Sequence, residues 1–146
     1  MDKPLVIVDV DGTVALREGP EARGPFDYDR VLEDRPNAPV IATVEALHAA
    51  GHPITFLSGR ESVPGCHDNT AQWLFEHLPN IGQFELYMRP HGDHRRDWIV
   101  KYEMYRELIA PRPVLLVLDD RPQVVRLWRD LGITCLQVAP GPAGER

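Results

Sequence analysis

The chain has 146 residues, of which 43% are hydrophobic and 26% charged, and this is the size and composition of one globular domain. Its formal net charge of −6 excludes a protein that coats nucleic acid through a broad basic surface, although a local basic patch is still allowed. No apolar run approaches the ~20 residues of a membrane span, and the N-terminus lacks the pattern of a signal peptide, so we expect a cytoplasmic protein without membrane contact.

The first predicted element is a strand at Leu5–Val8, because a short continuous apolar run is typical of a strand buried on both faces of a parallel sheet. Residues 14–36 are rich in Gly, Pro and charge, and we interpret them as a long loop or flap. A helix is predicted next, with Asn37 as its cap, Pro39 in its first turn and Gly51 at its end.

Strands and helices then alternate along the rest of the chain. Strands are predicted at residues 54–57, 84–88, 114–118 and 133–138, and helices at about 70–77, at about 96–109 and from 122 onward. This alternation predicts an α/β three-layer sandwich with a central parallel sheet of about five strands over residues 1–139. The tail at 140–146 is expected to be frayed, and Cys66 and Cys135, which lack metal-ligand spacing, are expected to be free thiols.

Polar side chains follow three of the predicted strands: Asp9 and Asp11, Ser58 and Arg60, and Asp119 and Asp120. Parallel α/β sheets bind their ligands at this edge. Four acids at one edge suit Mg²⁺, whose charge relieves the repulsion between carboxylates and admits a phosphate dianion. Asp9 can then attack phosphorus as a nucleophile, while Asp11 can protonate the leaving alkoxide and later activate water.

Two further groups suit a phosphate. The Ser58 hydroxyl and the Gly59 backbone N–H can hold a phosphate oxygen, although the ordinary role of a serine here is to form a turn. Lys101 is one of only two lysines, and its ammonium can offset the charge of phosphate and nucleophile. The ordinary alternative for Lys101 is a solvated position on a helix.

In this order, the residues resemble the four motifs of the haloacid dehalogenase-like (HAD-like) phosphohydrolases. The resemblance is carried by Asp9-Val10-Asp11-Gly12-Thr13, Ser58, Lys101 and Asp119-Asp120. It implies that Asp9 is the nucleophile and Asp11 the acid/base. It also implies that Mg²⁺ is held by Asp9, the Asp11 backbone carbonyl, Asp119 and Asp120, with Asp120 as the direct ligand of the last two.

From about Pro4 to Ala139 the chain is also similar to the phosphatase domain of bacteriophage polynucleotide kinase/3′-phosphatase. The similarity rests mainly on residues 23–27, 58–62, 92–101 and 119–138. It implies removal of 3′-phosphates, and of 2′,3′-cyclic phosphates, from the ends of RNA or DNA. Carried over by position, the phosphate- and substrate-binding residues are Thr13, Arg23, Ser58, Gly59, Arg60, Arg89, Asp97 and Lys101.

The chain has no Gly-Lys-Ser or Gly-Lys-Thr of a P-loop, so 5′ phosphorylation is expected to belong to a separate kinase or ligase partner. The segments after Thr13 and Ser58 are too short for a separate cap domain, and an open pocket can admit the end of a polymer. Within residues 89–101, four basic residues outweigh two acids, which makes this stretch a candidate for gripping the phosphates of a strand end.

Three alternatives stay open. A small-molecule phosphatase of the same superfamily, such as a nucleotidase, would use the same catalytic groups. A non-catalytic phospho-acceptor domain is disfavoured, because such a receiver keeps its acceptor Asp on a middle strand and not on the first. A non-catalytic module that binds nucleic acid ends is disfavoured by the intact acids and Lys101.

Overall fold

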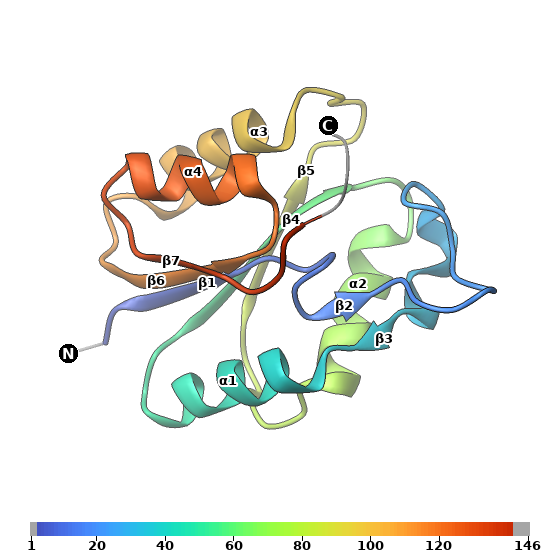
Figure 1. Cartoon of the computed structure of the whole chain (residues 1–146), viewed down its shortest axis with the longest axis horizontal. Coiled ribbons are helices and arrows are strands. Elements are labelled where there is room, and N and C mark those ends of the chain that lie inside the picture. The colour runs from blue at the N-terminus through green and yellow to red at the C-terminus, as the bar shows by residue number, and fades with distance from the viewer. Residues whose placement is uncertain (1–2, 142–146) are drawn as a thin grey trace.

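The computed structural model describes residues 3–141 and is built around a five-stranded parallel sheet (Figure 1). In spatial order its strands are β5 (Glu85–Arg89), β4 (Ile54–Glu61), β1 (Leu5–Val8), β6 (Val114–Asp119) and β7 (Cys135–Gln137). Each neighbouring pair runs parallel, as expected of strands joined by helical crossovers. The predicted α/β class and five-stranded sheet are confirmed.

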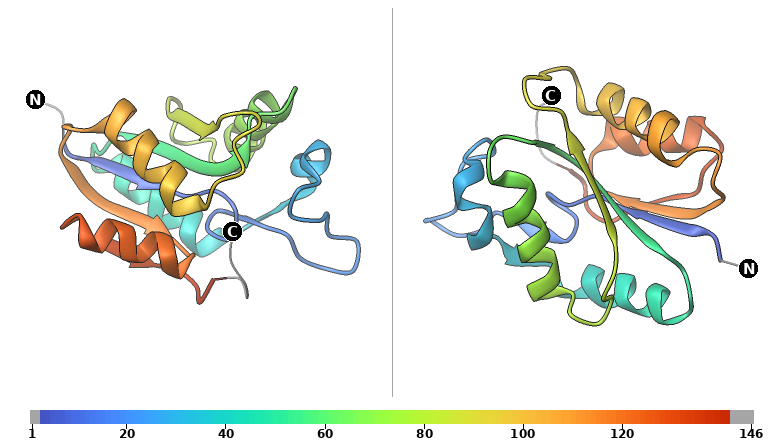
Figure 2. Two further views of the ribbon diagram at one scale, coloured as in Figure 1. Left: turned by 90° about the horizontal axis from the view of Figure 1, so that it is seen from above. Right: turned by 180° about the vertical axis from the view of Figure 1, so that it is seen from behind.

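Helices cover both faces of the sheet (Figures 1 and 2). The helices are α1 (Ala38–Ala49) and α2 (Cys66–His77) on one face, and α3 (Asp97–Met104) and α4 (Pro122–Asp130) on the other. Alternate residues of β1 divide between the two cores, because successive side chains in a strand point to opposite faces. Val6 and Val8 pack toward α1 and α2, whereas Leu5 and Ile7 pack toward α3 and α4. The central strand is therefore buried on both sides.

Residues 14–36 are more ordered than the predicted loop. They form a two-stranded antiparallel sheet, β2 (Ala15–Leu16) with β3 (Arg35–Pro36), and a 3₁₀ helix, η1 (Tyr28–Glu33). Tyr28 and Val31 of η1 are buried in a small apolar cluster that also contains Cys66 and Met88. The side chains of Tyr28 and Val31 therefore hold a mostly polar segment against the rest of the protein. Two apolar residues give no hydrophobic period, so sequence periodicity alone cannot reveal that the segment is ordered.

Several predicted boundaries shift in the structure. Strand β4 continues to Glu61, and α2 begins at Cys66 after Gly65, whose φ of 82° lies in the left-handed region. α3 ends at Met104 and passes into a π-helical turn, η2 (Tyr105–Ile109). Asn37 stands at the start of α1, as predicted, but its side chain donates to the carbonyl of Thr13 (2.9 Å) and does not cap the helix.

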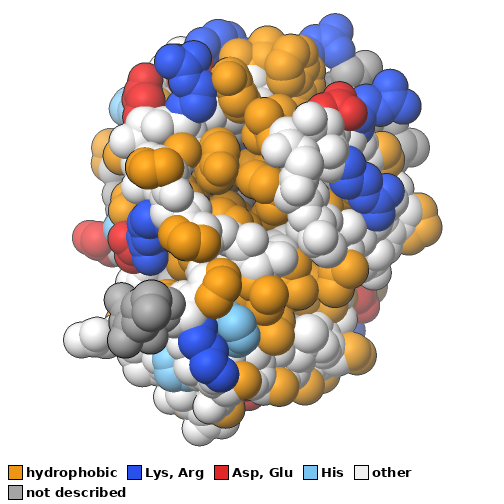
Figure 3. Space-filling view, turned by 90° about the vertical axis from the view of Figure 1, so that its left-hand side faces the viewer, with side chains coloured by type: hydrophobic (Ala, Val, Ile, Leu, Met, Phe, Trp, Pro, Cys, Tyr) orange, Lys and Arg blue, Asp and Glu red, His pale blue; other side chains and the backbone are white. Residues whose placement is uncertain are grey.

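The surfaces at the two ends of the parallel strands differ in chemistry. Figure 3 views the molecule from the left-hand side of Figure 1, where hydrophobic side chains gather on the surface. The exposed residues Leu108, Leu115 and Leu131 come from the ends of elements on this side. The acids predicted for the site lie instead where β1 and β6 end.

Both cysteines are buried and unpaired, which confirms the expected free thiols. Of the tail expected to be frayed, Pro140 and Gly141 belong to the described chain and residues 142–146 lie outside it. Within residues 3–141, no helix has the length and apolarity needed to cross a bilayer.

Candidate active site

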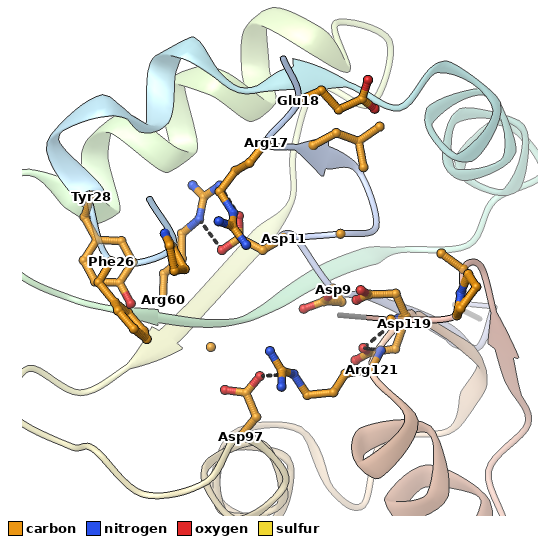
Figure 4. Close-up of a pocket in the computed structure, with 18 residues that line it drawn as sticks. Asp9, Asp11, Arg17, Glu18, Phe26, Tyr28, Arg60, Asp97, Asp119 and Arg121 are labelled. Atoms are coloured by element: carbon orange, nitrogen blue, oxygen red, sulfur yellow. Dashed lines mark hydrogen bonds and ion pairs between the residues drawn. The ribbon is translucent and has the colours of Figure 1, made fainter. Parts of the chain in front are cut away.

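A cavity of about 400 Å³ opens at the carboxyl ends of β1, β4 and β6 (Figure 4). Seven of the predicted site residues line it: Asp9, Asp11, Gly59, Arg60, Asp97, Asp119 and Asp120. Phe26, Tyr28 and Arg60 lie on one side of the cavity, and Asp97 and Arg121 lie on another. The residues brought together thus come from four separate parts of the chain.

Asp9 follows directly on β1 and is held through both of its carboxylate oxygens. Lys101, reaching from α3, donates to Oδ1 at 2.6 Å, and the Thr13 hydroxyl donates to Oδ2 at 2.9 Å. The same Lys101 ammonium also donates to Asp119 Oδ2 at 3.0 Å. Neither Lys101 nor Thr13 lines the cavity, so both contact the carboxylates on the side that faces away from the cavity.

Asp9, Asp119 and Asp120 form a buried carboxylate cluster. One oxygen from each residue lies within 4.8 Å of the others. Three carboxylates against the single Lys101 ammonium leave an excess of two negative charges, which a divalent cation balances. The hard oxygen donors are the ligand type that Mg²⁺ prefers, so the residues present fit this ion.

The pKa values of this cluster have clear physical causes. Burial, together with the charges of Asp119 and Asp120, raises the pKa of Asp9 well above its usual value, against the opposing effect of Lys101. Burial also raises the pKa of Asp120, with Asp119 adding to the shift. Burial alone would lower the pKa of Lys101, but the charges of Asp119 and Asp9 raise it, so Lys101 stays an ammonium. A cation among these acids would stabilise their ionised forms.

Two glycines allow the acids to approach so closely. Gly12 has a φ of 79°, and a Cβ there would lie 2.2 Å from Oδ2 of Asp120. A Cβ on Gly59 would lie 2.4 Å from Oδ1 of Asp97. Larger residues at these two positions would displace a carboxylate of the site, so both glycines are required by space, and Gly12 is also required by its positive φ.

Asp11 is oriented by two arginines. Arg60 donates to both oxygens of Asp11, from Nε at 3.0 Å and from Nη2 at 2.8 Å, and Arg23 donates to Oδ1 at 3.1 Å. Burial alone would raise the pKa of Asp11, but the charges and hydrogen bonds of Arg60 and Arg23 outweigh it and lower the pKa. The Asp11 side chain is 35% exposed, so it faces the cavity while the arginines stand behind it.

Asp34, which sequence reasoning did not select, fixes both of these arginines. Its carboxylate accepts from Arg23 Nε and Nη2 at 2.9 Å each and from Arg60 Nη2 at 2.8 Å. All three side chains are 1% exposed. Asp34 lies in the polar segment interpreted as a loop, where a lone Asp gives no signal, and only the fold of that segment brings it to the site.

Arg89 plays a similar part on the other side of the cavity. It is fully buried, donates to the Gly59 carbonyl at 2.8 Å and pairs with Asp97 Oδ1 at 2.5 Å. The other Asp97 oxygen pairs with Arg121 Nε at 3.2 Å. Arg89 thereby connects β5, β4 and the start of α3, and it holds Asp97 at the cavity wall.

Three predicted phosphate-binding arginines are buried and already paired within the protein. Arg23, Arg60 and Arg89 use their N–H groups on protein oxygens, and their contact with phosphate stays a prediction. Ser58 is buried, and its hydroxyl oxygen accepts from the Arg60 backbone N–H at 3.1 Å, so its contact with phosphate is likewise a prediction. Arg17, which was not predicted, is exposed and lines the cavity beside Asp11 (Figure 4).

Two other segments missed from the sequence also line the cavity. Phe26 is 58% exposed at its wall. Residues 139–141 return to the site from β7, and a Cβ on Gly141 would lie 2.6 Å from the Asp120 carbonyl. Part of the expected tail is therefore packed against a candidate metal ligand.

Comparison with known proteins assigns residues 3–142 to the family model described as "Polynucleotide kinase PNKP phosphatase domain". A viral protein named as a bifunctional polynucleotide kinase/RNA ligase, from Autographa californica nuclear polyhedrosis virus, is 39% identical over 132 residues. The match covers 88% of this chain and 18% of the viral protein.

Two solved structures resemble the fold closely. A chain in the structure of a Pnkp1/Rnl/Hen1 complex has a TM-score of 0.84 at 34% identity, over 95% of this chain and 47% of that one. A chain in the structure of the Pnkp1/Rnl/Hen1 RNA repair complex has a TM-score of 0.83 at 35% identity, over 93% and 42%. This chain therefore spans less than half the length of these relatives.

Proposed function

The chain belongs to the family of polynucleotide kinase (PNKP) phosphatase domains, with a HAD-like fold and phosphatase activity, and on this basis we propose that it is a Mg²⁺-dependent 3′-phosphatase of RNA ends. The observation that carries the proposal is the arrangement of Asp9. Its carboxylate lies at the floor of the cavity, beside Asp119 and Asp120 and fixed by Lys101. This arrangement suits a nucleophile that must meet a phosphate dianion.

In the proposed reaction, an Asp9 oxygen forms a bond to phosphorus as the bond from phosphorus to the ribose 3′ oxygen breaks. Asp11 gives its proton to that leaving oxygen, so the first products are a free 3′ hydroxyl and an aspartyl-phosphate. Asp11 then takes a proton from a water molecule, which attacks phosphorus and releases inorganic phosphate and the Asp9 carboxylate.

Asp9, Asp119 and Asp120 would hold Mg²⁺, which supplies charge neutralisation for the approaching phosphate when bound. The Asp11 backbone carbonyl completes the predicted ligand set. Lys101 balances the charge of Asp9 and Asp119. The hydrogen bond from the Thr13 hydroxyl fixes the orientation of the Asp9 carboxylate.

Asp11 needs a proton before it can act as an acid, yet Arg60 and Arg23 favour its ionised form. A phosphate dianion entering the cavity supplies the opposing charge, which raises the pKa of a nearby carboxyl group. Protonation of Asp11 is therefore expected to accompany substrate binding. The free enzyme holds Asp11 in position as a carboxylate.

The cavity also suits a nucleotide at the end of a strand. Phe26 offers an exposed ring on which a terminal base can stack, and Arg17 offers an exposed guanidinium near Asp11. The relatives named for RNA repair and for a polynucleotide kinase/RNA ligase favour RNA, and a separate kinase or ligase as the partner. Cytoplasmic repair of RNA is the setting that we propose.

The test is phosphate release from matched substrates with and without Mg²⁺: RNA and DNA oligonucleotides with 3′-phosphates, a 2′,3′-cyclic phosphate end and a 3′-mononucleotide. We expect the RNA 3′-phosphate to be hydrolysed with the highest kcat/KM, and the Asp9→Asn variant to be inactive on all four. A better rate with the mononucleotide at every ionic strength would favour the small-molecule phosphatase instead.

A further inference from the structure

A second groove lies directly beside the active-site cavity, between α3 and α4. The two helices pack together on one face of the sheet, and both begin near the edge where the cavity opens (Figure 1). The groove has a volume of about 510 Å³ and is lined by Trp98, Pro122, Gln123, Arg126, Leu127 and Asp130. The Asp97–Arg121 ion pair forms the cavity wall on this side, and the next residue of each segment lines the groove.

The chemistry of the groove is that of a single-strand binding surface. Trp98 is 40% exposed, whereas the other two tryptophans, Trp73 and Trp128, are buried. Arg126 is exposed and makes no hydrogen bond or ion pair within residues 3–141. An exposed indole ring beside an unpaired guanidinium can stack a base and hold a phosphate at the same time.

Gln123 adds a polar group to the wall. Its Oε1 atom is buried and has no hydrogen-bond partner in the part of the chain that the structure describes. Turning this amide toward a ligand therefore breaks no hydrogen bond at the oxygen, and a base amine or a ribose 2′ hydroxyl can donate to it. The groove thus combines one aromatic, one cationic and one amide side chain.

We propose that this groove binds the strand that lies 5′ to the 3′-phosphorylated nucleotide, with a base stacked on Trp98 and a backbone phosphate on Arg126. The inference rests on the proposed function, because it extends the same substrate out of the catalytic cavity. From Pro122 to Arg126 the helix rises about 6 Å. Asp130 lies one turn beyond Arg126, and its negative charge would repel the strand, so the groove accommodates a short segment only.

The experiment is a length series of RNA oligonucleotides from one to six nucleotides, each with a 3′-phosphate, alongside a small aryl phosphate. For the unaltered protein we expect kcat/KM to rise about ten-fold over the first few added nucleotides, as stacking and a phosphate contact allow. Trp98→Ala and Arg126→Ala should each remove most of this rise and retain hydrolysis of the aryl phosphate. Arg126→Ala should also make kcat/KM for the longer oligonucleotides less sensitive to salt, by the amount expected for the loss of about one phosphate contact.

Matched controls are Phe75→Ala, which removes an exposed aromatic ring on the opposite face, and Arg106→Ala, which removes an exposed arginine from η2. Neither should alter the length series. Because Trp98 is the exposed tryptophan, binding of a 3′-hydroxyl RNA product should quench the fluorescence of the unaltered protein, and this quenching should disappear in Trp98→Ala.

The results separate this inference from the proposed function. If no 3′-phosphorylated oligonucleotide is hydrolysed, the proposed function fails, and quenching still decides whether the groove binds RNA. If RNA is hydrolysed but Trp98→Ala and Arg126→Ala keep the full length effect, the groove inference is wrong. An equal loss on the aryl phosphate would also overturn it, because the residue would then act on the fold.

Discussion

Replacing Asp34 by Ala tests whether the buried ion pairs behind Asp11 hold the active site together. The change removes three hydrogen bonds of 2.8–2.9 Å and leaves the guanidinium groups of Arg23 and Arg60 buried with one carboxylate between them. Removing one partner of a buried ion pair costs about 3–5 kcal/mol of unfolding free energy. In a domain of this size that corresponds to a fall of roughly 10 °C in Tm.

Urea and thermal unfolding followed by circular dichroism measure this cost. Glu33→Ala is the matched control, because it removes the same charge one residue away from a side chain that is exposed and pairs with Arg30 at the surface. Exposed pairs contribute little, so this control should unfold close to the parent. Asp34→Asn keeps the shape of the side chain and should fall between the two.

The activity of Asp34→Ala provides a second measurement on the folded protein. Because Asp34 contacts Asp11 only through Arg23 and Arg60, its loss should slow a substrate that needs a protonated leaving group more than an activated aryl phosphate. A loss of less than about 1 kcal/mol in stability, with equal effects on both substrates, would refute the reasoning from buried ion pairs.

Four further predictions concern the catalytic cluster. Asp9→Asn should leave the fold intact and reduce the rate to less than about a hundredth of the parent, since an amide cannot form the acyl-phosphate; a higher rate in a single-turnover assay would exclude covalent catalysis. Asp11→Asn should lose more activity on a 3′-phosphate end than on an activated aryl phosphate, and equal losses would count against its role as the acid. EDTA should abolish activity, and Asp120→Ala should raise the Mg²⁺ concentration needed for activity or eliminate turnover, so full activity in EDTA would contradict the metal site. Gly12→Ala should displace the Asp120 carboxylate and raise the Mg²⁺ concentration needed for half-maximal rate, whereas an unchanged value would show that the loop adapts without cost.

The residues that sequence analysis could place are those at the ends of predicted strands. Asp9 and Asp119 follow directly from the apolar runs of β1 and β6, because parallel strands bring their carboxyl ends to one edge. Lys101 could be selected by its rarity and by family resemblance. Its reach to Asp9 and Asp119 depends on how α3 packs, which only the structure shows.

The sequence could not show which charged side chains are buried in the protein interior. An arginine near a strand end has the same local pattern whether it faces solvent or pairs with a buried carboxylate. Arg60 and Arg89 were therefore predicted as site residues without any indication that they are buried. Asp34 escaped detection for a related reason: it lies in a segment with no hydrophobic period, fixed only by a few apolar anchors.

The ion pairs that join residues 14–36 to the sheet have a consequence for protein engineering and for divergence within the family. Arg23 and Asp34 come from this segment, but their partners Asp11 and Arg60 belong to the core motifs. This segment cannot be exchanged between homologues as an independent module, because the graft would carry half of a charge network away from its other half. A chimera that transfers Arg23, Asp34, Asp11 and Arg60 together should keep the Asp11 carboxylate in position. A chimera that transfers only residues 14–36 should lose that position.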